Sequence, residues 1–466
     1  MTRSPSPTKQ IPPAHIFKAY DIRGVIGKDL GPETAYWIGR AIGSEARARG
    51  LQSIAIGRDG RLSGAMLAQS LAQGLAASGC DVTDVGQVPT PVLYFAAIHL
   101  GIHSGVMVTG SHNPPEYNGF KIVLGGETLH GDQIRALHAR IALDQFSEGT
   151  ATIRQTTVIP EYIHRIQSDI RIARRLRVVV DCGNGIAGAV APELFAALGC
   201  DVVPLFCKVD GTFPNHHPDP SQPANLQDLI AAVATHHADV GLAFDGDGDR
   251  LGVVAPGGKI IWPDRQMILF ARDVLTRKPG AEIIYDVKCS RTLRQAVLDA
   301  GGIPVMWKTG HSFIKARLKD PKAELAGEMS GHLFFKERWY GFDDGLYAGA
   351  RLLELLARDA RPADTVFAAL PDTLNTPELH IRVAEGEPHR LVAEITARAS
   401  FPEAETTTVD GLRLDFPDGW GLVRASNTTP VLVLRFEADN AVAMQRIQAE
   451  FARMIRAVKP DAVLPF

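Results

Sequence analysis

Cysteine is scarce in this chain of 466 residues. There are five cysteines, and no two of them form a C-x-x-C pair. A small, odd number of cysteines argues against a disulfide framework and favours a reducing compartment. We therefore expect the five thiols to pack in the core of the protein.

Long apolar segments are missing as well. No uninterrupted apolar run approaches the roughly 20 residues that a membrane helix needs, and the N-terminus lacks the apolar core of a signal peptide. Residues 1–13 are rich in Pro, Ser and Thr, which predicts a flexible tail. The sequence thus predicts a soluble, cytoplasmic protein with no membrane partner.

An excess of positive charge is also absent, because the formal net charge is -3. A nucleic-acid partner would call for a basic surface, so that class of function is excluded. No apolar surface helix indicates a dimer, and we expect a monomer. At about 150 residues per domain, the length suggests roughly three or four domains.

A strand–helix–strand unit is present three times. Each copy opens with a short apolar strand, at 54–56, 178–180 and 283–285, and continues through a polar loop into a helix that ends at a glycine. This is the layout of a parallel crossover unit. The first two copies share Gly-Cys-Asp-Val, at 79–82 and 199–202, which favours an internal repeat.

Each copy also has a later buried strand that ends in a polar loop. These loops lie at 109–114, 245–250 and 327–332. In open α/β sheets, ligands bind beyond the carboxyl ends of the strands. We therefore expect the three loops to face one shared cleft.

The chain after residue 371 has a different pattern. A strand at 379–384 precedes a helix that runs to about residue 399. Strands at 406–409 and 412–416 flank Asp410-Gly411, a signal for a two-residue hairpin turn. Two more strands and a closing helix indicate an antiparallel sheet covered by helices.

The predicted fold class is α/β with an added α+β domain. Three topologically similar α/β domains, with mixed sheets between helices, precede a C-terminal domain with an antiparallel sheet, and all four surround one central cleft. The predicted domain boundaries are 1–156, 157–258, 259–371 and 372–466.

The loop at 245–250 has the strongest local pattern. Asp245, Asp247 and Asp249 alternate with glycines, and three such carboxylates repel each other unless a cation lies among them. Oxygen ligands suit Mg²⁺ or Ca²⁺. An EF-hand would need Gly in place of Arg250 and Glu in place of Pro256, so that motif is excluded. A solvated acidic turn is the alternative.

Three further loops carry polar groups. Ser111, in Thr-Gly-Ser-His-Asn-Pro, is expected at an exposed loop tip, with Lys121 able to contact a transferring phosphoryl group; a plain turn is the alternative. The loop at 327–332 suits sugar hydroxyls or a helix cap. The loop at 424–430 suits a phosphate, or is a turn with an incidental arginine.

Together these loops resemble those of the α-D-phosphohexomutase superfamily. Thr-Gly-Ser-His-Asn-Pro, Asp-Gly-Asp-Gly-Asp-Arg, Gly-Glu-Met-Ser-Gly-His and Arg-Ala-Ser-Asn-Thr-Thr-Pro occur in the family's order, one per predicted domain. The resemblance covers nearly the whole chain and is closest to the bacterial phosphomannomutase/phosphoglucomutase group.

The resemblance implies an activity. It implies reversible conversion of hexose 1-phosphate and hexose 6-phosphate, of glucose and mannose, through a phosphoserine and a hexose 1,6-bisphosphate. The product would supply precursors for nucleotide sugars and polysaccharides. The implied partners are phosphosugars, and the implied cofactor is Mg²⁺, with the bisphosphate as activator.

The resemblance also implies roles for particular residues. Ser111 would carry the phosphoryl group. The implied metal ligands are Ser111, Asp245, Asp247 and Asp249. Charge neutralisation and proton transfer would come from Arg23, Lys121 and His332, with His112 and Arg250 in support. The implied substrate-binding residues are Tyr20, Lys288, His311, Glu328, Ser330, His332, Arg424, Ser426, Asn427 and Thr428.

Other activities fit parts of the pattern. Within the family, a phosphoglucosamine mutase is the alternative, although by resemblance Met329 favours a hexose without an amino group. A metal phosphatase using the aspartate loop would be a different class of enzyme. A non-catalytic sugar-phosphate-binding protein would be a third class.

Overall fold

The computed structural model of the protein describes residues 9, 11–427 and 429–466. The flexible tail predicted for residues 1–13 therefore falls largely outside the described residues, and Thr428 falls outside them entirely. The chain divides into two compact units. The first comprises Met1–Pro263, Lys315–Lys319 and Ser330–Ala368, and the second comprises Asp264–Ile314, Asp320–Met329 and Ala369–Phe466.

The first unit begins with a mixed sheet in the order β1-β5-β4-β2-β3-β7, with β6 paired to β5. Its strands are β1 (Ile22–Val25), β2 (Ser53–Arg58), β3 (Asp81–Gln87), β4 (Gly105–Val108), β5 (Tyr117–Leu124), β6 (Glu127–Thr128) and β7 (Ile153–Gln155). The central strand β2 is parallel to β3 and β4, whereas β5 is antiparallel to β4. Buried aliphatic side chains of β2 and β4 form the core under the helices.

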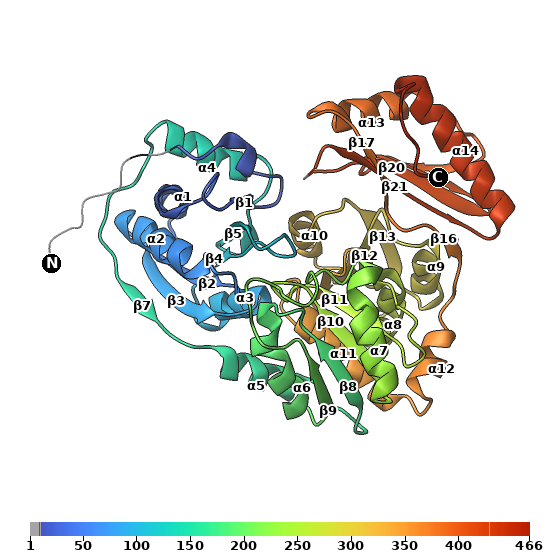
Figure 1. The fold of residues 1–466 in the computed structure, drawn as a ribbon, viewed down its shortest axis with the longest axis horizontal. Coiled ribbons are helices and arrows are strands. Elements are labelled where there is room, and N and C mark those ends of the chain that lie inside the picture. The colour runs from blue at the N-terminus through green and yellow to red at the C-terminus, as the bar shows by residue number, and fades with distance from the viewer. Residues whose placement is uncertain (1–8, 10, 428) are drawn as a thin grey trace. The chain divides into compact units, whose positions relative to one another are not determined.

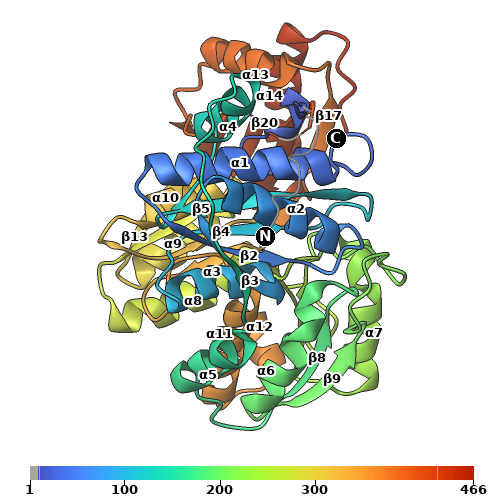
Figure 2. The same ribbon diagram turned by 90° about the vertical axis from the view of Figure 1, so that its left-hand side faces the viewer.

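Helices cover this sheet. They are α1 (Pro32–Ala48), α2 (Gly64–Ala77), α3 (Thr90–His99), α4 (Asp132–Ala142) and α5 (Ile159–Asp169), preceded by the 3-10 turn η1 (Ala14–Ile16). Helices α1 and α2 lie side by side (Figures 1 and 2). Helix α3 is buried along almost its whole length, as expected of a helix that is apolar on every side.

The second sheet of the first unit has the order β11-β10-β8-β9. Its strands are β8 (Arg177–Asp181), β9 (Asp201–Leu205), β10 (Val240–Phe244) and β11 (Leu251–Val254). Strand β10 is parallel to β8 and antiparallel to β11, so this sheet is also mixed. The other elements of this unit are η2 (Ile186–Ala189), α6 (Ala191–Ala197), η3 (Pro223–Leu226), α7 (Gln227–Thr235), β15 (Leu333–Phe335), α11 (Gly345–Arg358) and α12 (Ala363–Ala368).

The second unit opens with parallel strands in the order β13-β12-β14. These strands are β12 (Glu282–Asp286), β13 (Ile303–Trp307) and β14 (Ala323–Gly327). The helices of this stretch are α8 (Pro263–Arg277), α9 (Arg291–Asp299) and α10 (His311–Leu318). The side chain of Ser290 caps α9 by accepting a hydrogen bond from the N–H of Thr292.

An antiparallel sheet completes the second unit, in the order β16-β21-β20-β19-β18 with β17 paired to β21. Its strands are β16 (Leu374–Asn375), β17 (Leu379–Arg382), β18 (Glu405–Thr407), β19 (Leu412–Phe416), β20 (Gly419–Ala425) and β21 (Val431–Ala438). Helices α13 (Glu387–Arg398) and α14 (Ala441–Val458) cover one face of it (Figure 1) and bury a shared apolar core.

The predicted fold class is confirmed. The strand–helix–strand unit occurs as β2-α2-β3, β8-α6-β9 and β12-α9-β13. The glycines expected after the three helices, Gly79, Gly199 and Gly301, have φ of 85°, 92° and 76°, in the left-handed region that favours glycine. The central cleft and the exact domain boundaries stay predictions.

The predicted hairpin turn is wrong in detail. Strand β18 ends at Thr407 and β19 begins at Leu412, so four residues connect them instead of two. The reason lies in Asp410, whose carboxylate accepts hydrogen bonds from the N–H of Thr309 and from Arg424 Nε. These bonds draw the connection toward the preceding α/β segment.

Two smaller expectations can be compared with the structure. The five cysteines are free thiols; four are buried and Cys207 is half-buried, as expected of thiols in a core. None of the helices in the described part of the chain is long and apolar enough to cross a membrane.

Candidate active site

Two strand-end loops meet in the first unit. The Ser111 loop follows β4, and the aspartate loop at 245–250 connects β10 to β11. Gly246 permits their close approach, because a Cβ atom there would lie 2.3 Å from the carbonyl oxygen of Ser111. Any side chain at Gly246 would therefore separate the two loops.

Ser111 has an unusual backbone and a polar environment. Its φ of 50° is in the left-handed region, which L-residues other than Gly, Asn and Asp rarely adopt. Its Oγ lies 3.1 Å from His112 Nδ1 and donates a hydrogen bond of 3.3 Å to Asp245 Oδ2.

The prediction that Ser111 is exposed at a loop tip is wrong, since only 1% of the residue is accessible. It is buried because the aspartate loop and the Arg61 side chain pack against the Ser111 loop. Arg61 Nη2 donates to the carbonyl oxygen of Ser111 at 2.8 Å. The backbone of Ser111 is thus enclosed by protein, and its hydroxyl faces the carboxylate of Asp245.

The three aspartates form a compact group. All are completely buried, and their ligand atoms lie within 4.8 Å of one another. Burial and the neighbouring carboxylates of Asp249 and Asp247 raise the pKa of Asp245 well above its usual value. Oδ1 of Asp247 has no hydrogen-bond partner within the described part of the chain. Oδ1 of Asp249 has the ring of His332 at 3.5 Å, at the long limit of a hydrogen bond. A buried carboxylate oxygen without a donor fits a hard divalent cation.

Lys121, on β5, contacts the same group. Its Nζ lies 2.7 Å from Asp247 Oδ2 and 2.5 Å from Asp249 Oδ2. Burial alone would lower the pKa of Lys121, but the two carboxylates raise it well above its usual value. The lysine is therefore an ammonium ion that offsets part of the negative charge. Thr90, at the start of α3, adds a 2.5 Å hydrogen bond to Asp247 Oδ2.

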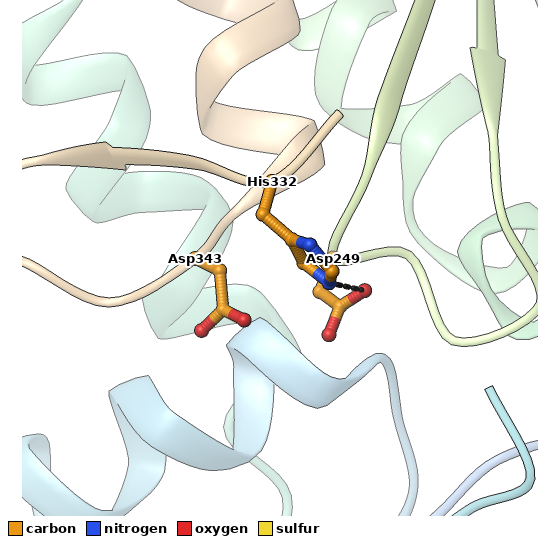
Figure 3. A group of neighbouring side chains, drawn as sticks. All are labelled: Asp249, His332 and Asp343. Atoms are coloured by element: carbon orange, nitrogen blue, oxygen red, sulfur yellow. Dashed lines mark ion pairs between the residues drawn. The ribbon is translucent and has the colours of Figure 1, made fainter. Parts of the chain in front are cut away.

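His332 forms an ion pair with Asp249, as Figure 3 shows. Its Nε2 is 3.5 Å from Asp249 Oδ1, and its Nδ1 is 2.8 Å from Ser330 Oγ. Burial alone would raise the pKa of Asp249, but Lys121 and His332 keep it well below its usual value. Asp343 completes a second group of possible metal ligands, yet Lys315 Nζ already lies 2.9 Å from it. The Asp245 group consists of carboxylates alone, the ligands that suit a hard cation such as Mg²⁺, and is therefore the better candidate for that metal.

The remaining predicted residues of the first unit surround this centre. Arg23, on β1, donates to Asn113 Oδ1 at 2.6 Å, within the Ser111 loop. Arg250 donates from Nε to His332 Nε2 at 3.3 Å. Burial, and the positive charge of Arg250, keep the pKa of His112 well below its usual value, so this imidazole is neutral. Tyr20 lies half-buried just before β1.

Six predicted binding residues belong to the second unit. They are Lys288, His311, Glu328, Arg424, Ser426 and Asn427. Lys288 follows β12, and its Nζ lies 2.5 Å from Glu378 Oε1. Burial alone would raise the pKa of Glu378, but the charge of Lys288 lowers it to about 2. The two side chains therefore form a charged pair.

The loop after β13 connects two of these residues. The N–H of Gly310 donates to Glu328 Oε1 at 2.5 Å, and the N–H of Thr309 donates to Asp410 Oδ2 at 3.0 Å. Asp410 also accepts from Arg424 Nε at 3.0 Å. Glu328 and Arg424 are thus connected through the loop at Thr309 and Gly310 and through Asp410. His311 begins α10 directly after this loop.

Sequence reasoning missed several residues that contact the predicted site residues, in the first unit and in the second. They are Asp59, Arg61, Thr90, Glu378 and Asp410. Asp59 and Arg61 lie in the polar loop after β2, and the rule that strand-end loops carry function would have selected them. Asp410 was interpreted only as a turn residue. Thr90 and Glu378 stand alone in the sequence, with no local pattern to distinguish them.

Family models match the chain in four consecutive segments. They describe alpha/beta/alpha domains I, II and III and the C-terminal domain of phosphoglucomutase/phosphomannomutase, and they match residues 14–148, 160–258, 262–374 and 378–454. These matches, which cover most of the chain, place the protein among the mutases, a class of isomerase.

Full-length relatives agree with this assignment. The phosphomannomutase/phosphoglucomutase of Pseudomonas aeruginosa is 58% identical over 97% of this chain and 98% of its own. A phosphoglucomutase of Neisseria meningitidis is 54% identical over the same shares. A solved phosphoglucomutase/phosphomannomutase family protein of Burkholderia thailandensis is 56% identical, covers 98% of this chain and 100% of its own, and superimposes with a TM-score of 0.93. The chain belongs to the phosphoglucomutase/phosphomannomutase family of the α-D-phosphohexomutase superfamily.

Proposed function

We propose that this protein reversibly converts hexose 1-phosphate and hexose 6-phosphate, of glucose and mannose, with Ser111 carrying the transferred phosphoryl group. One observation supports this above all: the Ser111 hydroxyl lies 3.3 Å from Asp245, within a buried group of three carboxylates. The printed names of the relatives from P. aeruginosa and N. meningitidis support the substrate class.

The reaction has two transfers. The P–O bond to Ser111 breaks as a P–O bond to the free sugar hydroxyl forms, which gives a hexose 1,6-bisphosphate. The bisphosphate turns around, and its other phosphate returns to Ser111. The attacking hydroxyl must lose a proton. His332 and Lys121 are the candidates for the group that takes it.

Charge neutralisation is the main requirement of such a transfer. Lys121 and Arg23 lie beside the Ser111 loop and would offset charge on the phosphoryl group. Asp245, Asp247 and Asp249, with Ser111, would hold Mg²⁺, which when bound stabilises charge on the transferred group. A hexose 1,6-bisphosphate would act as activator by phosphorylating a serine that had lost its phosphate.

The substrate would be bound by groups from four segments. We assign the phosphoserine to segment 1–156, the metal to 157–258, the sugar hydroxyls to 259–371 and the non-reacting phosphate to 372–466. The proposed binding residues are Tyr20, Lys288, His311, Glu328, Ser330, His332, Arg424, Ser426, Asn427 and Thr428. Comparing kcat/KM for glucose 1-phosphate and mannose 1-phosphate would rank the two sugars.

Intact-mass measurement tests the role of Ser111. We expect the protein treated with glucose 1,6-bisphosphate to gain about 80 Da, the mass of one phosphoryl group, and Ser111→Ala to gain nothing and lose mutase activity. Ser44→Ala is the matched control, since Ser44 is also fully buried but its hydroxyl bonds away from the Ser111 loop, to Arg40, Ser78 and Ser147. An active, unmodified Ser111→Ala protein would refute the proposal.

A further inference from the structure

Arg61 directs four of its five N–H donors at backbone carbonyl oxygens of residues 111–117. Its side chain is completely buried in the loop that follows β2. A guanidinium group has five N–H donors, and each one here has an acceptor. The acceptors are the carbonyl oxygens of Ser111 (2.8 Å), Asn113 (2.5 Å), Pro114 (2.6 Å) and Tyr117 (2.9 Å), and Asp59 Oδ2 (3.2 Å).

Asp59 binds the same loop from its other end. Its Oδ1 accepts from the N–H of Arg61 at 3.0 Å. Its Oδ2 accepts from Thr109 Oγ1 at 2.7 Å and from the N–H of Gly110 at 3.2 Å. The Asp59–Arg61 pair therefore binds backbone groups on both sides of Ser111, from Gly110 to Tyr117.

The guanidinium also packs closely against Gly110 of the loop. A Cβ atom on Gly110 would come within 2.5 Å of Arg61 Cζ. The next residue, Ser111, has the unfavourable φ of 50°. A conformation of this kind persists where the surrounding structure fixes it, and the contacts that fix it here come from Asp59 and Arg61.

We propose that Arg61 is a positioning residue for phosphoryl transfer. Together with Asp59 it fixes the backbone of Ser111, so that Oγ faces the metal-binding carboxylates. The inference rests on the proposed role of Ser111. Since all five donors are used within the protein, Arg61 has none left for a substrate phosphate. Its loss should therefore change kcat and leave KM nearly constant.

Arg61→Lys is the test variant. Lysine keeps the charge but presents three donors from one nitrogen, which cannot match four carbonyl oxygens and a carboxylate. A misplacement of about 1 Å can cost about 100-fold in rate, and we expect a kcat loss of about that size. KM for glucose 1-phosphate should stay within about threefold, as for loss of an interaction that matters only in the transition state.

Arg40→Lys is the matched control. Arg40 is a buried arginine of α1 that donates to the carbonyl oxygen of Ser147 and to Glu148, away from the Ser111 loop. We expect Arg40→Lys to lower Tm while kcat stays within about threefold of the wild-type value. If the two variants lose a comparable amount of Tm, a lower kcat in Arg61→Lys alone reflects the position of Ser111 and not a general loss of stability.

Two outcomes would overturn the inference. One is a kcat for Arg61→Lys equal to that of Arg40→Lys, and the other is a raised KM with unchanged kcat. If Arg61→Lys does not fold, Thr109→Val replaces it. This variant removes the hydroxyl that donates to Asp59 Oδ2 at 2.7 Å and accepts from the N–H of Ser111 at 2.8 Å, so it breaks the connection between Asp59 and the Ser111 backbone. An unchanged kcat would then overturn the inference. A wild-type protein that gains no phosphoryl group on Ser111 would instead refute the proposed function.

Discussion

Two loops of the molecule are fixed by buried arginines, but the arginines come from different places. The Ser111 loop is bound by Arg61, which belongs to the same α/β sheet. The loop of Lys288 is bound by two arginines of the C-terminal sheet. Arg413, on β19, donates to the carbonyl oxygens of Val287 and Cys289 at 2.7 Å each, and Arg435, on β21, donates to that of Lys288.

The difference separates two requirements. The loop with Ser111, the proposed phosphoryl carrier, needs an accurate position, and the loop after β2 of the same sheet supplies it. The loop with Lys288, a proposed binding residue, depends on a sheet formed by residues more than a hundred positions later. Arg413 can be buried there because Asp415 accepts from it at 2.8 Å and its guanidinium lies 3.8 Å from the centre of the Trp420 ring. Damage to the first loop should alter kcat, and damage to the second should alter substrate binding.

The largest effect is expected in the first unit, at the carboxylates. Asp245→Asn/Asp247→Asn removes two negative charges from the proposed metal ligands, and we expect activity to fall by about 1000-fold, since a bound metal contributes several kcal/mol to such a reaction. EDTA should abolish wild-type activity, and added Mg²⁺ should restore it. Wild-type rates in metal-free buffer, measured in a coupled assay, would contradict the metal assignment.

A smaller effect is expected from the second unit. Arg413→Lys keeps the charge but cannot donate to Asp415 and to two loop carbonyl oxygens at once, so we expect about 2 kcal/mol less stability on denaturant unfolding. KM for glucose 1-phosphate should rise by about tenfold, and phosphorylation of Ser111 should persist. Arg446→Lys is the control, because Arg446 pairs with Asp418 on the surface, where an ion pair contributes little. If Arg413→Lys lowered kcat and left KM unchanged, the Lys288 loop would behave like the Ser111 loop, and the proposed difference between them would be wrong.

The smallest effect is expected at Asp410. Asp410→Asn keeps an oxygen for the N–H of Thr309 but removes the charge beside Arg424. A charged hydrogen bond exceeds a neutral one by about 1 kcal/mol, so KM should change by about fivefold or less, with kcat constant. Steady-state kinetics with both hexose 1-phosphates would measure KM and kcat of the variant. A change in kcat alone would contradict the prediction, because it would mean that Asp410 affects the transfer step and not substrate binding.

Sequence reasoning succeeded where a pattern is local. The apolar strands and the glycines after the repeated helices follow from short-range periodicity, and Asp245, Asp247 and Asp249 are adjacent in the chain. The contact of Ser111 with the aspartate loop could only be expected through the strand-end rule. The burial of Ser111 could not be predicted, because it depends on contact with Gly246, which belongs to a different sheet and is distant in the sequence.

Arg61 shows a second reason why part of the centre was missed. Four of its five acceptors are backbone carbonyl oxygens, and these leave no side-chain pattern in a sequence. The same holds for Arg413 and Arg435, which bond to the backbone of the Lys288 loop. Residues that act on substrate form motifs, whereas residues that fix a loop by its backbone do not.

Transfer of a labelled phosphoryl group tests the central claim most directly. The protein would be labelled with ³²P from glucose 1,6-bisphosphate, freed of excess reagent and mixed with unlabelled glucose 1-phosphate in a rapid-quench instrument. We predict that the label leaves the wild-type protein for hexose phosphate at the rate of turnover, and that Ser111→Ala takes up none. Label retained on the wild-type protein during turnover, or released as inorganic phosphate, would contradict the account.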